Sequence, residues 1–453
     1  MSAPRWSLLV AIGALSLLSC AKERPVIPPG PLLGDRITYE FAIYYPGRPL
    51  QDPMATLEVL LKDKAFPFRR VKEQEVPKEG LALAVSRVSD ARTSLPLPSA
   101  DSLQRYGHGL DAAQAAAMAR TNQAVVLDFG YRGKHVWDGL KAANVLISRL
   151  AHETGGLIWD AESREAFTPA AWDEKRLDFG TDDVPSVSGH FVVHVYQDGE
   201  TVRAVSVGLT KIGLPDLVVE PTSWSNSDST VLLIDLLAQA LAEGQVVGPD
   251  GRFDLDLRKL RNARVRDPQL KSLKKGGTGV ARLVLRQGVR AKGDAENRLA
   301  AITFDRYPGS DPPARLAAAL DGLLGGEDAA EKIEHDEELV AASRRARAKL
   351  PALQAAFNRG LPPGEYVMLK SPFPMSNGGK EWMWVEVTSW KGSEIRGILS
   401  NEPADSPGLK LGQVVKVSED EVLDYLHRFP DGKEEGNLTG AVIMKRRGLK
   451  PAR

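Results

Sequence analysis

The sequence predicts an α+β fold, with a mixed α/β N-terminal body and a C-terminal small, bent β-sheet or partial barrel that a helix precedes. Three observations predict this fold. Short apolar strands interleave with amphipathic helices from residue 36 without a strict βαβ period, so ferredoxin-like sandwiches are one arrangement open to the body. An acidic run at 327–338 begins an amphipathic helix. Residues 365–445 combine β-forming segments with Gly, Pro and Asn turns.

The composition excludes several classes of protein. The 453 residues are 43% hydrophobic and 26% charged, as in an ordinary globular protein. Lys and Arg total 59 and Asp and Glu also total 59, which argues against a globally basic nucleic-acid binder. The single cysteine excludes a disulfide framework and any Cys-based zinc or iron–sulfur site. We therefore predict no cofactor, no metal site and no nucleic-acid partner.

The N-terminus has the pattern of a secretory signal. An uncharged, mostly apolar run, Trp6–Ser19, follows Arg5. It is shorter than the about 20 residues that a membrane-spanning helix needs, but it suits the apolar region of a signal peptide. The run ends in Leu17-Leu18-Ser19-Cys20, which resembles a bacterial lipobox, so Cys20 is the predicted lipid-attachment residue. The alternative is a plain secretory signal with an incidental cysteine.

This pattern predicts a localisation. Residues 1–19 would be the signal peptide, and 20–35, rich in Pro and Gly, a short tether. The predicted partner is the membrane, through an N-terminal lipid anchor in the bacterial cell envelope. Ala21 follows Cys20 where an Asp would signal inner-membrane retention in enteric bacteria, so the outer membrane is favoured.

An α+β domain is expected over residues 36–248. Clusters of β-branched and aromatic residues predict strands at 37–45, 81–88, 124–129, 157–160, 190–196, 202–207 and 217–220. The turn Gln197-Asp198-Gly199 suits a hairpin between two of these strands. Helices are expected at 52–64, at 111–120 behind an Asp N-cap, at 136–150 with Gly155 as the stop, and at 229–243.

A basic segment is expected over 249–326, with strands at 280–287 and 299–307 and a helix at 313–324. Residues 251–298 carry 14 Lys and Arg against five Asp and Glu. This stretch could contact anionic lipids or phosphorylated glycans. The favoured interpretation is that it pairs with the acidic run 327–338.

The last domain is expected over 327–453. In its helix, acidic residues come early and Arg residues late, which suits the helix dipole. Pro351 should kink or restart this helix, and Gly360 should end it. The strand 381–388 follows, then a strand at 395–399, a turn at 401–403, a strand at 414–417 and a short helix at 421–425.

Residues of this domain provide the candidate binding site. On the strand 381–388, Met383, Val385 and Val387 share a core face, whereas Trp382, Trp384 and Glu386 share the other face. That second face either packs under a helix or forms a binding surface. The candidate binding residues are Glu381, Trp382, Trp384, Asn401 and Asp424. The alternatives are core packing for the tryptophans, Trp390 included, and turn or cap hydrogen bonds for the two carboxylates.

Residues 336–440 resemble the bacterial domain-of-unknown-function family 2314. The resemblance is carried by the order and spacing of Asp336–Leu339, Arg344–Phe357, Glu381–Trp384, Gly397–Pro403, Gly412, Leu423–Tyr425 and Gly436-Asn437. Trp382 stands where the family often has His, and Asp424-Tyr425 where it often has Asp-Trp. The missing His removes the most obvious acid/base candidate. The resemblance implies no established activity.

The leading hypothesis is a non-catalytic binding or interaction protein of the cell envelope, with an envelope protein or a cell-wall component as partner. No catalytic residue is predicted. The alternative is an envelope hydrolase acting on cell-wall glycan or peptide, with Glu381 and Asp424 as acid and base. Glycosidase-type chemistry would require these carboxyl groups about 5–10 Å apart in a cleft. A mainly structural envelope protein is the third possibility.

Overall fold

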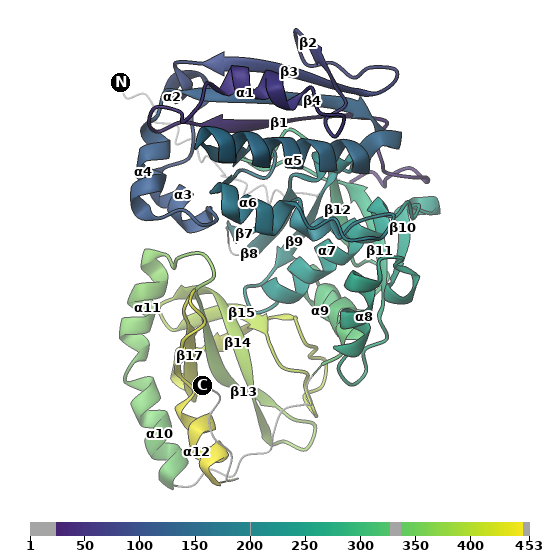
Figure 1. The fold of residues 1–453 in the computed structure, drawn as a ribbon. Helices are drawn as coiled ribbons and strands as arrows, with labels where there is room; N and C mark the ends of the chain where they lie inside the picture. Colours follow the sequence, from purple (N-terminus) through teal and green to yellow (C-terminus); the bar gives the residue numbers. More distant parts are fainter. Residues whose placement is uncertain (1–23, 200, 327–336, 447–453) are drawn as a thin grey trace, which may run out of the picture.

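The computed structural model describes residues 24–199, 201–326 and 337–446, which form three six-stranded sheets (Figure 1). Cys20 and residues 327–336 of the acidic run lie outside these ranges. None of the helices within these ranges has the length and hydropathy of a membrane span. The predicted α+β class is confirmed.

The first sheet has the strand order β2-β3-β4-β1-β5-β6. Its strands are β1 (Arg36–Tyr44), β2 (Phe68–Val71), β3 (Leu81–Val88), β4 (Ala124–Arg132), β5 (Leu157–Asp160) and β6 (Glu165–Phe167). Its helices are α1 (Pro53–Leu60), α2 (Ala91–Ser94), α3 (Ala100–Tyr106), α4 (Ala112–Arg120), α5 (Val136–Thr154) and α6 (Pro169–Arg176). Alternate residues of β1 and β4 are buried on opposite faces, one packed against α1 and α5 and the other against α2, α3 and α4.

The second sheet has the order β10-β11-β12-β9-β8-β7, so β7 is an edge strand. Its strands are β7 (Val192–Asp198), β8 (Thr201–Val207), β9 (Asp216–Thr222), β10 (Arg252–Asp256), β11 (Val280–Gln287) and β12 (Leu299–Thr303). Its helices are α7 (Ser227–Ala242), α8 (Ala263–Lys271) and α9 (Pro312–Leu324). The expected domain boundary at 248/249 falls inside this sheet, because β12 pairs in parallel with β9.

The N-terminal residues 24–34, which belong to the expected tether at 20–35, are bound along the second sheet. Ile27 N donates to Leu285 O at 3.0 Å, and Gly30 N donates to Val247 O at 2.8 Å. Leu32 is buried. Because of these contacts, residues 24–34 of the expected tether are part of the folded body.

The basic stretch pairs locally within the described residues. Arg261 contacts Asp183 at 2.9 Å, and Arg264 contacts Asp178 at 2.5 Å. Both acidic partners precede α7, so charge compensation of this stretch does not depend only on the acidic run. The partners of the acidic residues at 327–336 lie outside what the structure describes.

The third sheet is antiparallel throughout, with the order β16-β15-β14-β13-β17-β18. Its strands are β13 (Tyr366–Pro374), β14 (Lys380–Lys391), β15 (Glu394–Leu399), β16 (Val414–Ser418), β17 (Asp424–Arg428) and β18 (Glu434–Gly436). Its helices are α10 (Glu337–Arg347), α11 (Leu350–Arg359) and α12 (Leu438–Arg446). The helix before the sheet breaks just ahead of Pro351, as predicted.

One local prediction in this domain is wrong. The short helix expected at 421–425 is a single 3₁₀ turn at Glu419–Glu421, after which Asp424 begins strand β17. Tyr425 pairs with Leu369 in the ladder between β17 and β13. Pairing with a distant strand thus overrides the local helical pattern.

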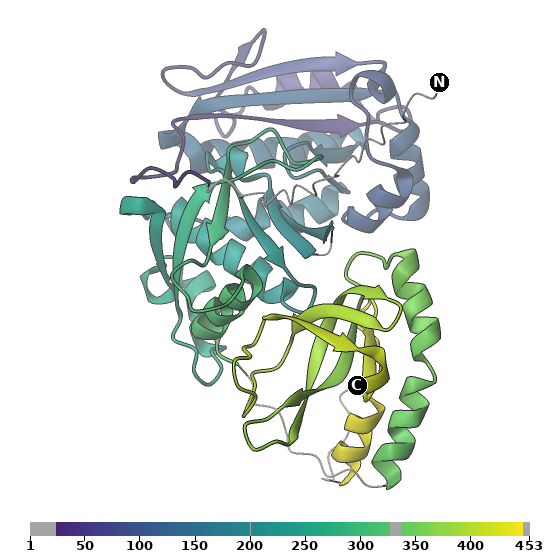
Figure 2. The ribbon, with the colours of Figure 1, turned by 180° about the vertical axis from the view of Figure 1, so that it is seen from behind.

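The third sheet is attached to the second through a buried carboxylate. Glu386 on β14 is 2% exposed and accepts hydrogen bonds from Trp224 N at 2.7 Å and Ser225 N at 2.8 Å, just before α7. Asp311 at the start of α9 accepts a hydrogen bond from Val414 N at 3.2 Å. Figure 2 shows the third sheet beside the second, with α10 and α11 on its outer side.

Candidate functional site

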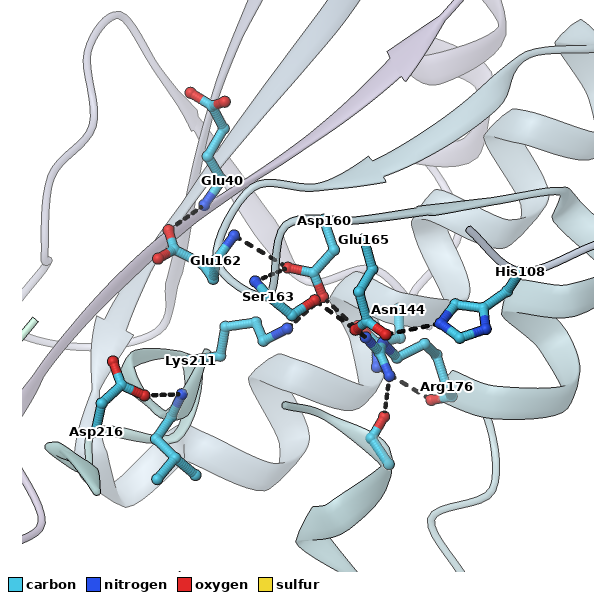
Figure 3. Close-up of polar contacts among 12 residues, drawn as sticks. Glu40, His108, Asn144, Asp160, Glu162, Ser163, Glu165, Arg176, Lys211 and Asp216 are labelled. Carbon is cyan, nitrogen blue, oxygen red and sulfur yellow. Dashed lines mark hydrogen bonds and ion pairs between the residues drawn. The ribbon is translucent and has the colours of Figure 1, made fainter. Parts of the chain in front are cut away.

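A buried charge network lies where the first and second sheets meet (Figure 3). The hairpin between β5 and β6 supplies Asp160 and Glu165. Arg176 on α6 donates to Glu165 Oε2 at 2.6 Å, Asp160 Oδ2 at 3.3 Å and Ser163 Oγ at 3.2 Å. Lys211, in the short 3₁₀ helix Leu209–Ile212 between β8 and β9, forms an ion pair with Asp160. The network therefore joins the two sheets.

Two anions and two cations balance in this network. An isolated buried ion would cost several kcal/mol of desolvation, and partners with good geometry offset that cost. Burial opposes ionisation of Glu165, but hydrogen bonding to His108 and the charge of Arg176 outweigh it and lower the pKa of Glu165 to about 2. His108 Nε2 lies 2.7 Å from Glu165 Oε1, at the edge of the network.

A second pair of carboxyl groups borders the network. Glu40 on β1 donates its backbone N–H to Glu162 Oε1 at 3.2 Å. Burial raises the pKa of each side chain to about 7, and neighbouring Asp128 and Asp160 add to the effect at Glu40 and Glu162 respectively. No group of three His, Cys, Asp or Glu side chains suited to a metal ion occurs among the described residues.

A cavity of about 380 Å³ adjoins the network. Its walls come from α3, β6, β7, β8, the 292–294 loop and the segment between α11 and β13. The apolar part of the lining includes Leu103, Ala166, Val195, Val205 and Val207. Pockets of about 300–1,000 Å³ with apolar walls and a few polar groups are typical of small-ligand sites.

The 292–294 loop is held over the cavity by a buried ion pair. Arg203 on β8 is 2% exposed and contacts Asp294 Oδ2 at 2.6 Å. Asp294 Oδ2 also accepts a hydrogen bond from Ala291 N at 2.8 Å. Arg164 Nη1, in the hairpin between β5 and β6, donates to Gly293 O at 2.5 Å. The cavity is therefore framed by groups whose positions are fixed.

Cationic and imidazole side chains occupy one part of the lining. Arg164 and Lys292 are exposed residues at the cavity. Burial lowers the pKa of His194 on β7, and nearby Arg164 adds to this, so the imidazole is neutral at pH 7. Arg164 has φ of 58°, a left-handed conformation that is uncommon for a residue other than Gly.

The two predicted carboxylates hold backbone elsewhere in the third domain. Glu381 is buried and accepts hydrogen bonds from Ala404 N at 2.7 Å, Asp405 N at 3.2 Å and Ser406 Oγ at 2.8 Å. Asp424 Oδ2 accepts from Thr439 N at 2.7 Å and Thr439 Oγ1 at 2.6 Å, in the first turn of α12. These contacts are the turn and cap hydrogen bonds that the sequence left as the alternative.

The other predicted binding residues are also spread over the third sheet. Asn401 Oδ1 accepts a hydrogen bond from Trp384 N at 2.6 Å. Trp384 is half-buried with Lys370 Nζ 5.4 Å from its ring centroid, and Trp382 is half-buried beside it on the strand. Trp390 is buried in the core. None of the five predicted binding residues lines the cavity: Glu381, Trp382, Trp384, Asn401 and Asp424.

Sequence reasoning did not find the cavity. Its lining comes from six segments between residues 98 and 363, and none of them carries a motif. The clearest local signal is Arg164 in the tight hairpin between β5 and β6, which a sequence alone does not mark as left-handed.

Comparison with known proteins assigns one part of the chain to a family. Residues 336–449 match the model of a bacterial family described as "Uncharacterized protein conserved in bacteria (DUF2314)". The third sheet and its helices therefore form a DUF2314 domain. No curated protein and no solved structure matches the chain. The match covers about a quarter of the sequence and includes only Pro363 of the cavity lining.

Proposed function

We propose that the protein is a non-catalytic binding protein of the bacterial cell envelope, anchored through lipid on Cys20, and that the cavity is its ligand site. The observation that supports this proposal most strongly is the cavity of about 380 Å³, which has apolar walls and a few polar groups. Its 292–294 loop is fixed by the Arg203–Asp294 pair, which favours binding because little order must be gained. The ligand would be an envelope or cell-wall component.

The hydrolase alternative loses its acid/base pair. Glu381 and Asp424 are both buried, and each accepts hydrogen bonds from backbone N–H groups and a hydroxyl. Such donors stabilise the charged form of a carboxyl group and occupy the lone pairs that a substrate would need. A binding role requires neither residue to react.

The anchor has sequence support in the lipobox-like segment Leu17–Cys20 and in Ala21, which favours the outer membrane. Metabolic labelling with an alkyne analogue of palmitate tests it directly. The parent protein should be labelled and found in the outer-membrane fraction, whereas Cys20→Ser should be unlabelled. Equal labelling of both would refute the anchor.

The binding role is tested by native mass spectrometry of the full-length protein purified from membranes in mild detergent. The parent should retain a small molecule that is lost in His194→Trp, which fills the cavity, because His194 lines it on the same sheet face as Val205. Val246→Trp is the matched control, because Val246 is exposed and does not line the cavity. Absence of any retained molecule, together with no binding of added ligands, would reject the cavity as a ligand site.

A further inference from the structure

We infer that the cavity takes a monoanionic amphiphile, a molecule with an apolar chain and one carboxylate, whose head group is held by Arg164. This inference rests on the proposed function, because it names the class of ligand for the same cavity. It follows from three properties of the lining: an apolar wall, an uncompensated cationic group and a hairpin that fixes that group.

The apolar wall lies on the sheet face opposite to α7 and α9. Val205 on β8 is directly opposite His194 on β7, and Val207 is opposite Val192. Leu103 of α3 and Ala166 of β6, both buried, complete the wall from the first sheet. An apolar chain in this cavity would lose contact with water on several sides, which is the main driving force for binding such a ligand.

The charge in the cavity favours an anion. Asp294 lines the cavity, but its charge is compensated by Arg203 at 2.6 Å. Arg164 and Lys292 have no acidic partner among the described residues. A guanidinium has five N–H donors, and the structure describes one hydrogen bond from Arg164, to Gly293 O. The remaining donors suit the two oxygens of a carboxylate.

The buried network positions Arg164. Its neighbours in the hairpin, Ser163 and Glu165, are both bound by Arg176 at 3.2 and 2.6 Å. Arg164 adopts its left-handed conformation between these two fixed residues. Such conformations cost energy in residues other than Gly and are concentrated at functional sites. The network thereby acts as a support for the cationic group of the cavity.

The test compares dodecanoate with dodecanol, which share a chain and differ in charge, by isothermal titration calorimetry on the full-length protein below the micelle concentration. Dodecanoate should bind the parent at least about tenfold more tightly, the effect of a charge-assisted hydrogen bond. Arg164→Asn should abolish this preference, because Asn tolerates the left-handed backbone but lacks the charge. Arg105→Asn, on α3 but outside the cavity, is the matched control.

Each other outcome is decisive. Equal affinity of the parent for acid and alcohol, with both lost in His194→Trp, would overturn the anionic class while the proposed binding function stands. A preference that persists in a folded Arg164→Asn would overturn the role of Arg164. Failure of both compounds, with no molecule retained in native mass spectra, would overturn the inference and the proposed function together. Circular dichroism and thermal unfolding verify the fold of every variant.

Discussion

Lys211, in the connection between β8 and β9 of the second sheet, and Asp160 of the first sheet form an ion pair in which the two side chains are 1% and 0% exposed. Asp160 also accepts from Arg176, and Arg176 in turn binds Glu165. A buried pair of this kind contributes little net stability compared with apolar residues, but breaking it is costly. Its structural effect is to fix the relative position of the two sheets, and with it the wall of the cavity.

Removing the cation of this pair should therefore destabilise the protein. Lys211→Met leaves Asp160 buried with Arg176 alone, and we expect the free energy of unfolding to fall by about 3 kcal/mol. Urea denaturation followed by circular dichroism measures it. Lys62→Met, on the exposed surface, is the control and should change stability by less than about 0.5 kcal/mol. A comparable small loss for Lys211→Met would show that the pair does not hold the sheets.

Local structure was largely predictable where local rules decide it. The helix at 111–120 was expected from its Asp N-cap, and the structure has the full capping box between Asp111 and Gln114. Pro351 marks the helix break because proline cannot donate an intrahelical hydrogen bond. Met383 and Val385 are buried on one face of β14 as the two-residue alternation requires.

The site was not predictable for a physical reason. Asp160, Arg176 and Lys211 come from three elements, and only tertiary packing places their charges together. The same holds for Glu386, which the alternation placed on the face of β14 that carries Trp382 and Trp384 but whose partners are 161 and 162 residues away. Periodicity specifies which face a residue occupies; it does not specify what covers that face.

The pKa of Glu162, raised to about 7, predicts that the free energy of unfolding depends on pH. The folded state holds this proton more tightly than the unfolded state, whose carboxyl titrates near 4.5. The contribution to stability is therefore full below pH 4.5 and is lost as pH rises toward 7. Glu162→Gln should remove this loss and raise stability at pH 8 by about 2–3 kcal/mol relative to its effect at pH 5.

Urea denaturation at pH 5, 6, 7 and 8 measures this difference for the parent and for Glu162→Gln. Titrating groups that do not interact with Glu162 cancel in the comparison, because they are common to both proteins. Glu174→Gln, at an exposed position on α6, is the control and should give a difference that does not vary with pH. A pH-independent difference for Glu162→Gln as well would contradict the protonation of Glu162 in the folded protein.

The attachment of the DUF2314 domain should depend on Glu386. Glu386→Leu leaves the N–H groups of Trp224 and Ser225 without their acceptor, at a cost of about 1–3 kcal/mol. Hydrogen exchange of these two amides should accelerate about tenfold or more. Glu394→Leu, an exposed position on β15, is the control. Unchanged exchange at both amides would mean that the carboxylate does not hold the interface.

The bound N-terminal segment predicts how an anchored protein would face the membrane. Four peptide steps join Cys20 to Arg24, and these can span at most about 14 Å. Lipid on Cys20 would therefore keep the surface around Arg24 close to the head groups. That surface is concave and includes Arg252, Arg286 and Arg306 together with the exposed Val26; Arg286 pairs with Asp305 and Arg306 with Asp254, whereas no ion pair of Arg252 is described. Cationic side chains at such a surface would attract anionic lipids.

A photocrosslinking amino acid, p-benzoylphenylalanine, checks this orientation in membranes that contain the full-length protein. Placed at Arg252, it should form adducts with phospholipid. At Arg359, an exposed position on α11 on the opposite side of the molecule, it should form several-fold fewer adducts (Figures 1 and 2). Cys20→Ser should remove the adducts at position 252, because the surface is then no longer held at the bilayer. Equal adduct formation at the two positions would contradict a fixed orientation, even for a protein whose lipid anchor had been demonstrated.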